Sequence, residues 1–257
     1  MISFILTSRV VNNPDSHIFD LIDSAIECAS EPEEQIEFII KYDEDDTCKL
    51  TKKQFDDRYE DEILIKYHKW SRGEGRHAIH NDHFYLFSQR DPRSRFIMIC
   101  ADDFIFTREG FIDEILSIKD EFAFVGYNTP RLDIYGNKDW LKWIEHWKHN
   151  EGMCLPCFST RTAEVLQNFG WQCNADNWQT LINILLKSEY DINIWHTIEP
   201  YYARKYNVTG ASGYGPTFNN MEIDGSRNCG NPYYFDLVKQ QVKNLYLNIK
   251  ESNQCQK

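Results

Sequence analysis

Two adjacent acids, Asp102 and Asp103, follow a short apolar run and are the residues best placed to do chemistry in this sequence. The run from Phe96 to Ala101 is apolar throughout and follows a charged, turn-like segment, which predicts a buried strand. Adjacent carboxylates repel each other, and a divalent cation, which prefers oxygen ligands, would relieve that repulsion. The dipeptide alone fits either a metal site or a solvated strand end whose acids cap the next helix.

A second acidic cluster, residues 43–46, follows a strand predicted over Ile36 to Tyr42. Strand and helix patterns alternate along the chain, with further strands predicted over 2–6, 62–67 and 122–127, and this alternation favours a mostly parallel sheet. Ligands of such sheets bind in the crevice beyond the carboxyl ends of the strands. We therefore expect Asp43 and the Asp102–Asp103 pair to face one crevice.

Two arginines, Arg72 and Arg76, lie in a glycine-bearing loop over residues 70–77, before a helix predicted over 78–87. Arginine matches phosphate oxygens in a fork, and the rest of the protein is acidic. The loop is therefore a candidate for a phosphate contact, and solvation of both arginines at the surface is the alternative.

Two later residues are candidates because of their positions in the chain. Asp176 lies at the start of a helix that is predicted to continue to about Leu186, where an acid is commonly an N-cap or a partner of the helix dipole. His196 directly follows a strand predicted over 191–195. A lone histidine after a strand is more often structural than a ligand, but a strand tip also makes it a candidate.

The remaining elements are predicted from apolar residues spaced three and four apart. The chain predicts further helices over 15–29, 51–60, 107–116, 139–147, 161–169 and 234–249. Gly170 is the expected left-handed residue after the helix over 161–169.

Composition limits the class of function. A length of 257 residues fits one large domain, with its body over 1–206 and a loop or lid plus a terminal helix over 207–257. The net charge of −12 argues against a nucleic acid partner. No apolar run approaches the roughly 20 residues of a transmembrane segment, and the apolar start is too short for a signal peptide, so a cytoplasmic protein is expected.

The eight cysteines have no framework spacing, so free thiols are expected. Cys154 and Cys157 form a single CxxC pair. The pair has no second CxxC for a zinc site and does not open a helix after an early strand, so neither zinc binding nor redox chemistry is favoured.

The order of these elements resembles the GT-A fold of nucleotide-sugar-dependent glycosyltransferases, nearest to family 2, over residues 2–205. The resemblance is carried by Thr7-Ser8-Arg9 after the first strand, Asp43 after the second, the loop with two arginines, and Ala101-Asp102-Asp103. It implies an α/β fold: a single Rossmann-like domain with a mostly parallel central sheet flanked by helices.

The resemblance also implies roles for individual residues. Thr7, Arg9 and Asp43 would hold the nucleoside of the donor. Asp102 and Asp103 stand at the family's DxD-type motif, which binds Mn²⁺ or Mg²⁺ and the diphosphate, although alanine stands where a first aspartate is common.

Two further roles follow from the same resemblance. Asp176 would be the catalytic base of an inverting enzyme, and His196 would be a third protein ligand of the metal. Arg72 and Arg76 remain candidates for a phosphate contact on their own chemistry, because arginine matches phosphate oxygens in a fork.

The function implied is transfer of a sugar from a UDP-sugar or GDP-sugar to a glycan or other hydroxyl acceptor. The first alternative is a GT-A-like module that binds a sugar or nucleotide without catalysis. The second is a nucleotidyltransferase of related fold, for which the segment from Thr7 to Val11 lacks the usual glycine-rich loop and lysine.

Overall fold

A computed structural model describes residues 1–8, 16–44, 50–71, 78–102, 104–126, 155–167, 175–205 and 232–255. Its strands are β1 (Ile2–Ser8), β2 (Ile36–Asp43), β3 (Leu64–Trp70), β4 (Phe96–Cys100), β5 (Phe104–Phe106), β6 (Phe124–Gly126), β7 (Cys157–Ser159), β8 (Trp195–Thr197) and β9 (Tyr202–Arg204). Its helices are α1 (Ser16–Cys28), α2 (Pro32–Gln35), α3 (Lys52–Tyr59), α4 (Ala78–Ser88), α5 (Phe111–Ser117), α7 (Thr160–Leu166), α8 (Ala175–Tyr190) and α10 (Pro232–Cys255).

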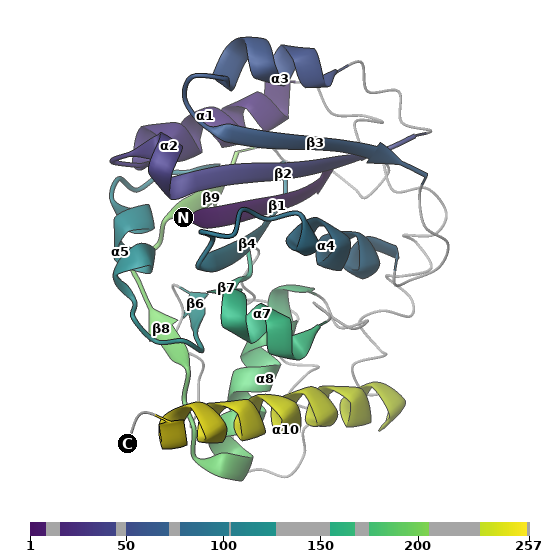
Figure 1. The fold of residues 1–257 in the computed structure, drawn as a ribbon, viewed down its shortest axis with the longest axis vertical. Helices are drawn as coiled ribbons and strands as arrows, with labels where there is room; N and C mark the ends of the chain where they lie inside the picture. The colour runs from purple at the N-terminus through teal and green to yellow at the C-terminus, as the bar shows by residue number, and fades with distance from the viewer. Residues whose placement is uncertain are drawn as a thin grey trace.

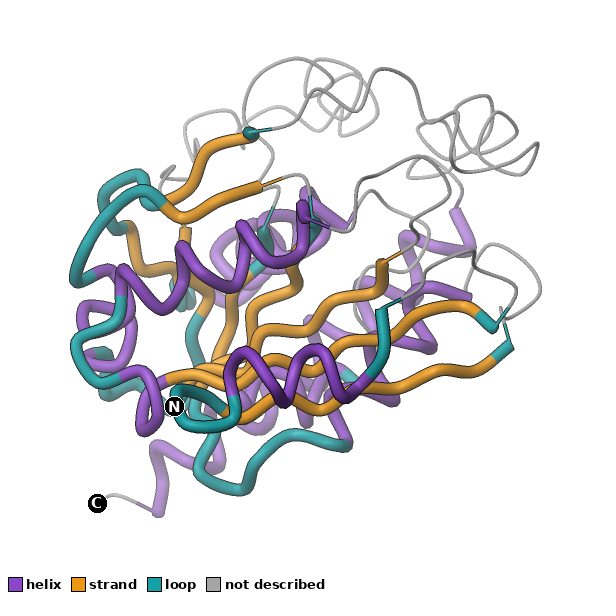
Figure 2. Tube along the Cα trace, turned by 90° about the horizontal axis from the view of Figure 1, so that it is seen from above, coloured by secondary structure: helices purple, strands orange, loops and turns teal. Residues whose placement is uncertain are grey.

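Seven strands form one sheet in the order β3-β2-β1-β4-β7-β6-β8, and β5 and β9 form a separate pair. Strands β1 to β4 are parallel, β7 is antiparallel to both β4 and β6, and β8 is parallel to β6. The large sheet is therefore mostly parallel, and helices lie on both of its faces (Figures 1 and 2). This confirms the predicted α/β architecture.

The central strands are apolar along their whole length because both of their faces are covered. Phe4 and Leu6 point to one face of the sheet, where they join a core cluster with the buried side of α1. Ile5 and Ile39 point to the other face and join a second cluster with side chains of α4, α8 and α10. The alternation along each strand therefore decides which polar side chains lie beneath α4.

Helix α10 packs against α8 and α7, and its buried side includes Val238, Val242 and Leu245. The helix predicted over 139–147 lies outside the described residues. In the part of the chain that is described, none of the helices combines the length and apolar character that crossing a membrane requires.

The predicted helix over 107–116 is wrong in its first turn. The chain forms β5 up to Phe106, and α5 begins only at Phe111. Gly110, before the helix, has a φ of 73°, a conformation that suits glycine and prevents the helix from beginning earlier.

The predicted strand over 191–195 is also wrong for its first residues. Asp191 has a φ of 57°, which breaks the extended backbone. The Asn183 side chain accepts a hydrogen bond from the Ile194 N–H at 3.1 Å, and the Asn193 side chain accepts one from the Trp195 N–H at 3.2 Å. Side chains thus satisfy backbone donors before β8 begins.

The predicted end of the helix over 161–169 is wrong as well. Helix α7 ends at Leu166, and Gln167, with a φ of 55°, takes the left-handed position that was expected at Gly170. Gly170 itself lies outside the described residues.

Candidate functional site

The carboxyl ends of the first four strands of the sheet meet at one edge. The arrowheads of β1, β2 and β3 point to the same side in Figure 1. The chain places β2 on one side of β1 and β4 on the other, so the strand order reverses at β1. Such a reversal is where α/β sheets open a crevice for ligands.

Three of the predicted site residues lie at this edge. Thr7 is the last residue but one of β1, Asp43 ends β2, and Asp102 follows β4 by two residues. Asp43 is 8% exposed and Asp102 is partly buried. Arg9, Arg72, Arg76 and Asp103 lie outside the described residues.

Thr7 points toward α4. In the sheet it lies beside Lys41, which in turn lies beside His68. The Thr7 Oγ1 atom and the Nε2 atom of His83 on α4 are 3.2 Å apart and share a hydrogen bond. The end of β1 is thus tied to the helix that covers this face of the sheet.

A buried lysine joins β2 to the same helix. Lys41 is 2% exposed, and its ammonium group contacts the carboxyl group of Asp43 and the Oδ2 atom of Asp82, the latter at 2.9 Å. A charge in the interior is tolerated only where partners replace water. Asp82 also accepts a hydrogen bond at 3.0 Å from the indole N–H of Trp70, and the Lys41 Nζ atom lies 5.3 Å from the centre of the Trp70 ring.

Sequence reasoning missed this cluster of Lys41, Asp82 and His83. The only signal for Lys41 is a single cation inside the apolar strand IEFIIKYD, and the signal for the other two is a polar pair inside a helix. The contact explains why Asp43 has a fixed position, because Lys41 holds one of its oxygens. A carboxyl group with two oxygens retains capacity for a further donor.

The described residues supply part of the predicted metal site. Asp102 offers the hard oxygen ligand that Mg²⁺ and Mn²⁺ prefer, next to Asp103 in the chain. Within the described ranges, no three side chains of His, Cys, Asp or Glu come together in a way that could hold a metal ion. The predicted partner of Asp102 in this site, Asp103, lies outside the described residues.

The structure does not bring His196 to Asp102. His196 lies level with Val125, Cys157 and Met98 across four neighbouring strands, so it is three strands, or about 14 Å, from β4. Its Nε2 atom contacts the Oδ2 atom of Asp120 at 3.0 Å. Both residues border a cavity of about 550 Å³ beside the end of α10.

Asp176 lies in the first turn of α8, and its side chain is outside the described set. The next residues fix this end of the helix. Trp178 is 1% exposed and packs edge-on against Phe124 and Phe158, and the Gln179 amide donates a hydrogen bond to the Val125 carbonyl at 3.4 Å. The start of α8 therefore lies over β6, two strands from β4.

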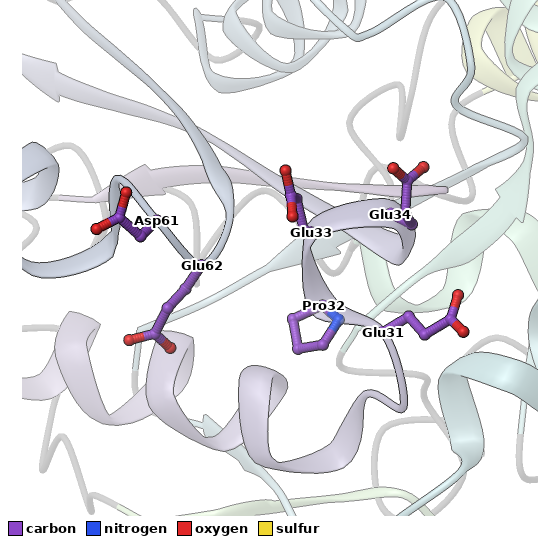
Figure 3. Close-up of a pocket in the computed structure, with 6 residues that line it drawn as sticks. All are labelled: Glu31, Pro32, Glu33, Glu34, Asp61 and Glu62. Atoms are coloured by element: carbon purple, nitrogen blue, oxygen red, sulfur yellow. The ribbon is translucent and has the colours of Figure 1, made fainter.

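A second cavity, of about 460 Å³, is acidic and lies away from this edge. Figure 3 shows its lining, which is Glu31, Pro32, Glu33, Glu34, Asp61 and Glu62. These residues precede β2 and β3, so the cavity borders the amino ends of the strands. Glu34 is paired with Arg93 at 3.2 Å, and the cavity adds nothing to the crevice.

The CxxC pair has no exposed thiol at its second position. Cys157 is fully buried in β7, and burial raises the pKa of its thiol well above the ordinary value. Cys154 lies outside the described residues. A thiol held neutral in the core is a weak nucleophile.

His68, which lies beside Lys41 in the sheet, makes the stability of the fold depend on pH. Partial burial lowers the pKa of His68 below its ordinary 6.5, and the charge of Lys66 lowers it further. Below about pH 6.5 the His68 side chain binds a proton more readily in the unfolded chain than in the folded protein. The free energy of unfolding should therefore fall as the pH falls below about 6.5.

We expect the free energy of unfolding to fall less at low pH in His68→Gln than in the parent. Urea unfolding of parent and variant at about pH 7.5 and about pH 5.5 measures it. An equal fall in the free energy of unfolding for both proteins would contradict the assignment to His68.

Neither the protein-family models nor the curated protein sequences give a match to this chain. Among solved structures, it is similar to 4-diphosphocytidyl-2C-methyl-D-erythritol synthase from Anaerococcus prevotii, with a TM-score of 0.46 and 14% identity over 87% of this chain and 98% of that one. It is also similar to mouse xyloside xylosyltransferase 1 in its apo form, with a TM-score of 0.43 and 10% identity over 77% and 84%.

Proposed function

We propose that this protein is a GT-A-type glycosyltransferase that moves a sugar from a nucleoside diphosphate sugar to an acceptor hydroxyl, with inversion at the anomeric carbon. The observation that supports this most is that Thr7 in β1, Asp43 in β2 and Asp102, two residues beyond β4, lie at one carboxyl edge where the strand order reverses. The sequence predicts a role at one site for all three residues.

The donor side of the site is built from β1 and β2. Thr7, held by His83, and Asp43, held by Lys41, offer a hydroxyl and a carboxyl group to the nucleoside. Arg9 is assigned to the nucleoside on the resemblance, and Arg72 and Arg76 are assigned to the phosphates because arginine matches phosphate oxygens in a fork. The net charge of −12 makes these local cations necessary for an anionic donor.

The acid pair is assigned to the diphosphate. A divalent cation, when bound by Asp102 and Asp103, supplies charge neutralisation on the departing phosphate. Asp102 lies directly beyond β4, which pairs with β1, and Asp103 is the next residue in the sequence.

The transfer step needs a proton acceptor. The acceptor oxygen forms a bond to the anomeric carbon while the bond from that carbon to the phosphate oxygen breaks. The acceptor hydroxyl loses its proton to the Asp176 carboxylate, and the nucleoside diphosphate leaves with the bonding electrons. Attack from the face opposite the leaving group inverts the configuration.

A hydrolysis screen of UDP-sugars and GDP-sugars with Mn²⁺ tests the proposed function, because such enzymes release nucleotide slowly to water. Release from at least one donor is expected. The second candidate function is a binding module without catalysis, which Ala101 at the usual place of an aspartate favours. A module of that kind would bind UDP or GDP equally well with and without Mn²⁺ and would release no sugar.

We expect Asp43→Ala to weaken binding of UDP or GDP by about 1 to 3 kcal/mol, the cost of leaving a buried hydrogen-bond partner unmet. Calorimetric titration measures the loss. Asp82 remains as a partner for Lys41 in this variant, so the fold should persist.

The matched control is Glu44→Ala, which changes the neighbouring, exposed acid. Nucleotide affinity should stay the same in that control. If Asp43→Ala binds nucleotide as tightly as the parent, Asp43 serves only to hold Lys41.

A further inference from the structure

Helix α4 reaches the donor side of the site through two consecutive residues, Asp82 and His83. His83 shares a hydrogen bond with Thr7 near the end of β1. Asp82 contacts Lys41 in β2, and the ammonium group of Lys41 also contacts Asp43 at the end of the same strand. One turn of α4 therefore contacts both strands from which the proposed nucleoside contacts come.

The contacts of Lys41 are shielded from water. Its side chain is 3% exposed, and those of Asp43 and Asp82 are 11% and 14% exposed. An ammonium group at this depth needs protein partners in place of water. Lys41 contacts the Oδ1 atom of Asp43, which leaves the Oδ2 atom of that carboxyl group for a further donor.

Asp82 is held from two strands. Its Oδ1 atom accepts a hydrogen bond from the indole N–H of Trp70 at 3.0 Å, and its Oδ2 atom accepts one from Lys41 at 2.9 Å. Trp70 belongs to β3 and Lys41 to β2. A lysine side chain has many rotamers in solution, and a carboxylate fixed at both of its oxygens selects among them. The place of the Lys41 ammonium group is therefore set by Asp82 as well as by Asp43.

Stability alone does not explain a second carboxylate. Asp43 already supplies the opposite charge for Lys41. A buried ion pair is often no more stable than apolar side chains of similar volume, and Ile39 and Ile40, which precede Lys41 in β2, are fully buried apolar residues. A network that adds a further, largely buried acid to such a pair is better explained by control of position than by stability.

We propose that Asp82 is a positioning residue of the nucleoside site: it fixes Lys41, and Lys41 holds Asp43 so that the Oδ2 atom of Asp43 faces the nucleoside. This inference rests on the proposed function. Asp82 acts through Lys41 and touches no part of the donor. Without the charge of Asp82, Asp43 is the only carboxylate that remains among the contacts of Lys41 in the described part of the chain. We expect Asp43 then to turn both oxygens toward the ammonium group, so that the nucleoside loses its acceptor.

A double-mutant cycle between Asp82 and Lys41 tests this on the full chain. UDP and GDP are titrated by calorimetry into the parent, Asp82→Asn, Lys41→Met and the double variant. Asparagine keeps an acceptor for Trp70, and the double variant removes the two charges beneath α4 together, so it should fold. Each single substitution should weaken nucleotide binding by roughly 3-fold to 30-fold. The double variant should lose no more than either single one, because Asp82 acts only through Lys41.

Two controls separate positioning from a general disturbance of the edge. Pyrophosphate with Mn²⁺, a probe without a nucleoside, should bind equally to the parent and Asp82→Asn. Asp57→Asn makes the same chemical change in the exposed pair of Asp57 with Lys53, 2.6 Å apart on α3, and should leave nucleotide affinity unchanged.

Several outcomes would overturn the proposal. These are nucleotide binding by Asp82→Asn as tight as that of the parent, losses in the single variants that multiply in the double variant, or an equal loss of pyrophosphate binding. Crystal structures of the parent and Asp82→Asn add a test without nucleotide, because Asp43 should turn toward Lys41 in the variant, and an unchanged Asp43 overturns the inference. A parent that binds neither UDP nor GDP refutes the proposed function, and the two crystal structures then still decide the role of Asp82.

Discussion

Replacing Asp176 with asparagine should lower sugar transfer by roughly 10²-fold to 10⁴-fold, the contribution of a general base, while donor binding persists. Asparagine keeps the shape of the side chain and its capacity to cap a helix, but it does not accept the proton of the acceptor hydroxyl. Transfer rates and donor affinity, measured on the same preparation, test this.

The position of α8 makes this substitution informative. Trp178 and Gln179 hold the start of the helix against β6 independently of Asp176. The free energy of unfolding should therefore change little in Asp176→Asn, and a loss of rate would report chemistry.

The control for Asp176→Asn is Glu189→Gln, which makes the same chemical change at an exposed position near the other end of α8. That variant should transfer sugar at the rate of the parent. Near-parental turnover in Asp176→Asn would place the base elsewhere. A parent protein inactive on every donor would instead favour the binding module.

Asp103→Ala should abolish the gain in UDP or GDP affinity that Mn²⁺ provides. The acid pair directly follows β4 in the sequence, and carboxylate oxygens are ligands that Mn²⁺ prefers. Calorimetry with Mn²⁺, and again with EDTA, measures the difference for parent and variant.

His196→Ala is the informative control for the metal prediction. Because His196 is paired with Asp120 three strands from β4, its loss should leave the Mn²⁺ dependence unchanged. An unchanged affinity in Asp103→Ala with Mn²⁺ would remove the acid pair from the metal site. A loss in His196→Ala would show that the histidine ligates metal after all.

The sequence predicted the elements that are long or continuously apolar. β1, β2 and β4 are short apolar runs that end in polar residues, and this pattern is sufficient to place Thr7, Asp43 and Asp102 at one edge. Their meeting needs only that the strands are parallel and adjacent, which alternation with helices already indicates.

The parts that were missed depend on contacts between distant residues. Lys41 is one residue in an apolar strand, and only the crossing of α4 brings Asp82 to it. The strands β5, β7 and β9 have three residues each, which is too short for a period of two to be recognised. The place of His196 depends on the order of β6, β7 and β8, which spacing along the chain does not reveal.

The pairing of β5 with β9 has a consequence for how the protein folds. β5 begins directly after Asp103 and pairs with residues about 100 positions later, with Phe104 opposite Arg204. Closing so long a loop is slow, so this pairing should follow the assembly of β1 to β4. During synthesis β5 would thus gain its partner strand only after Arg204 has left the ribosome, and a fragment that stops at the end of β4 would hold the parallel strands without this pair.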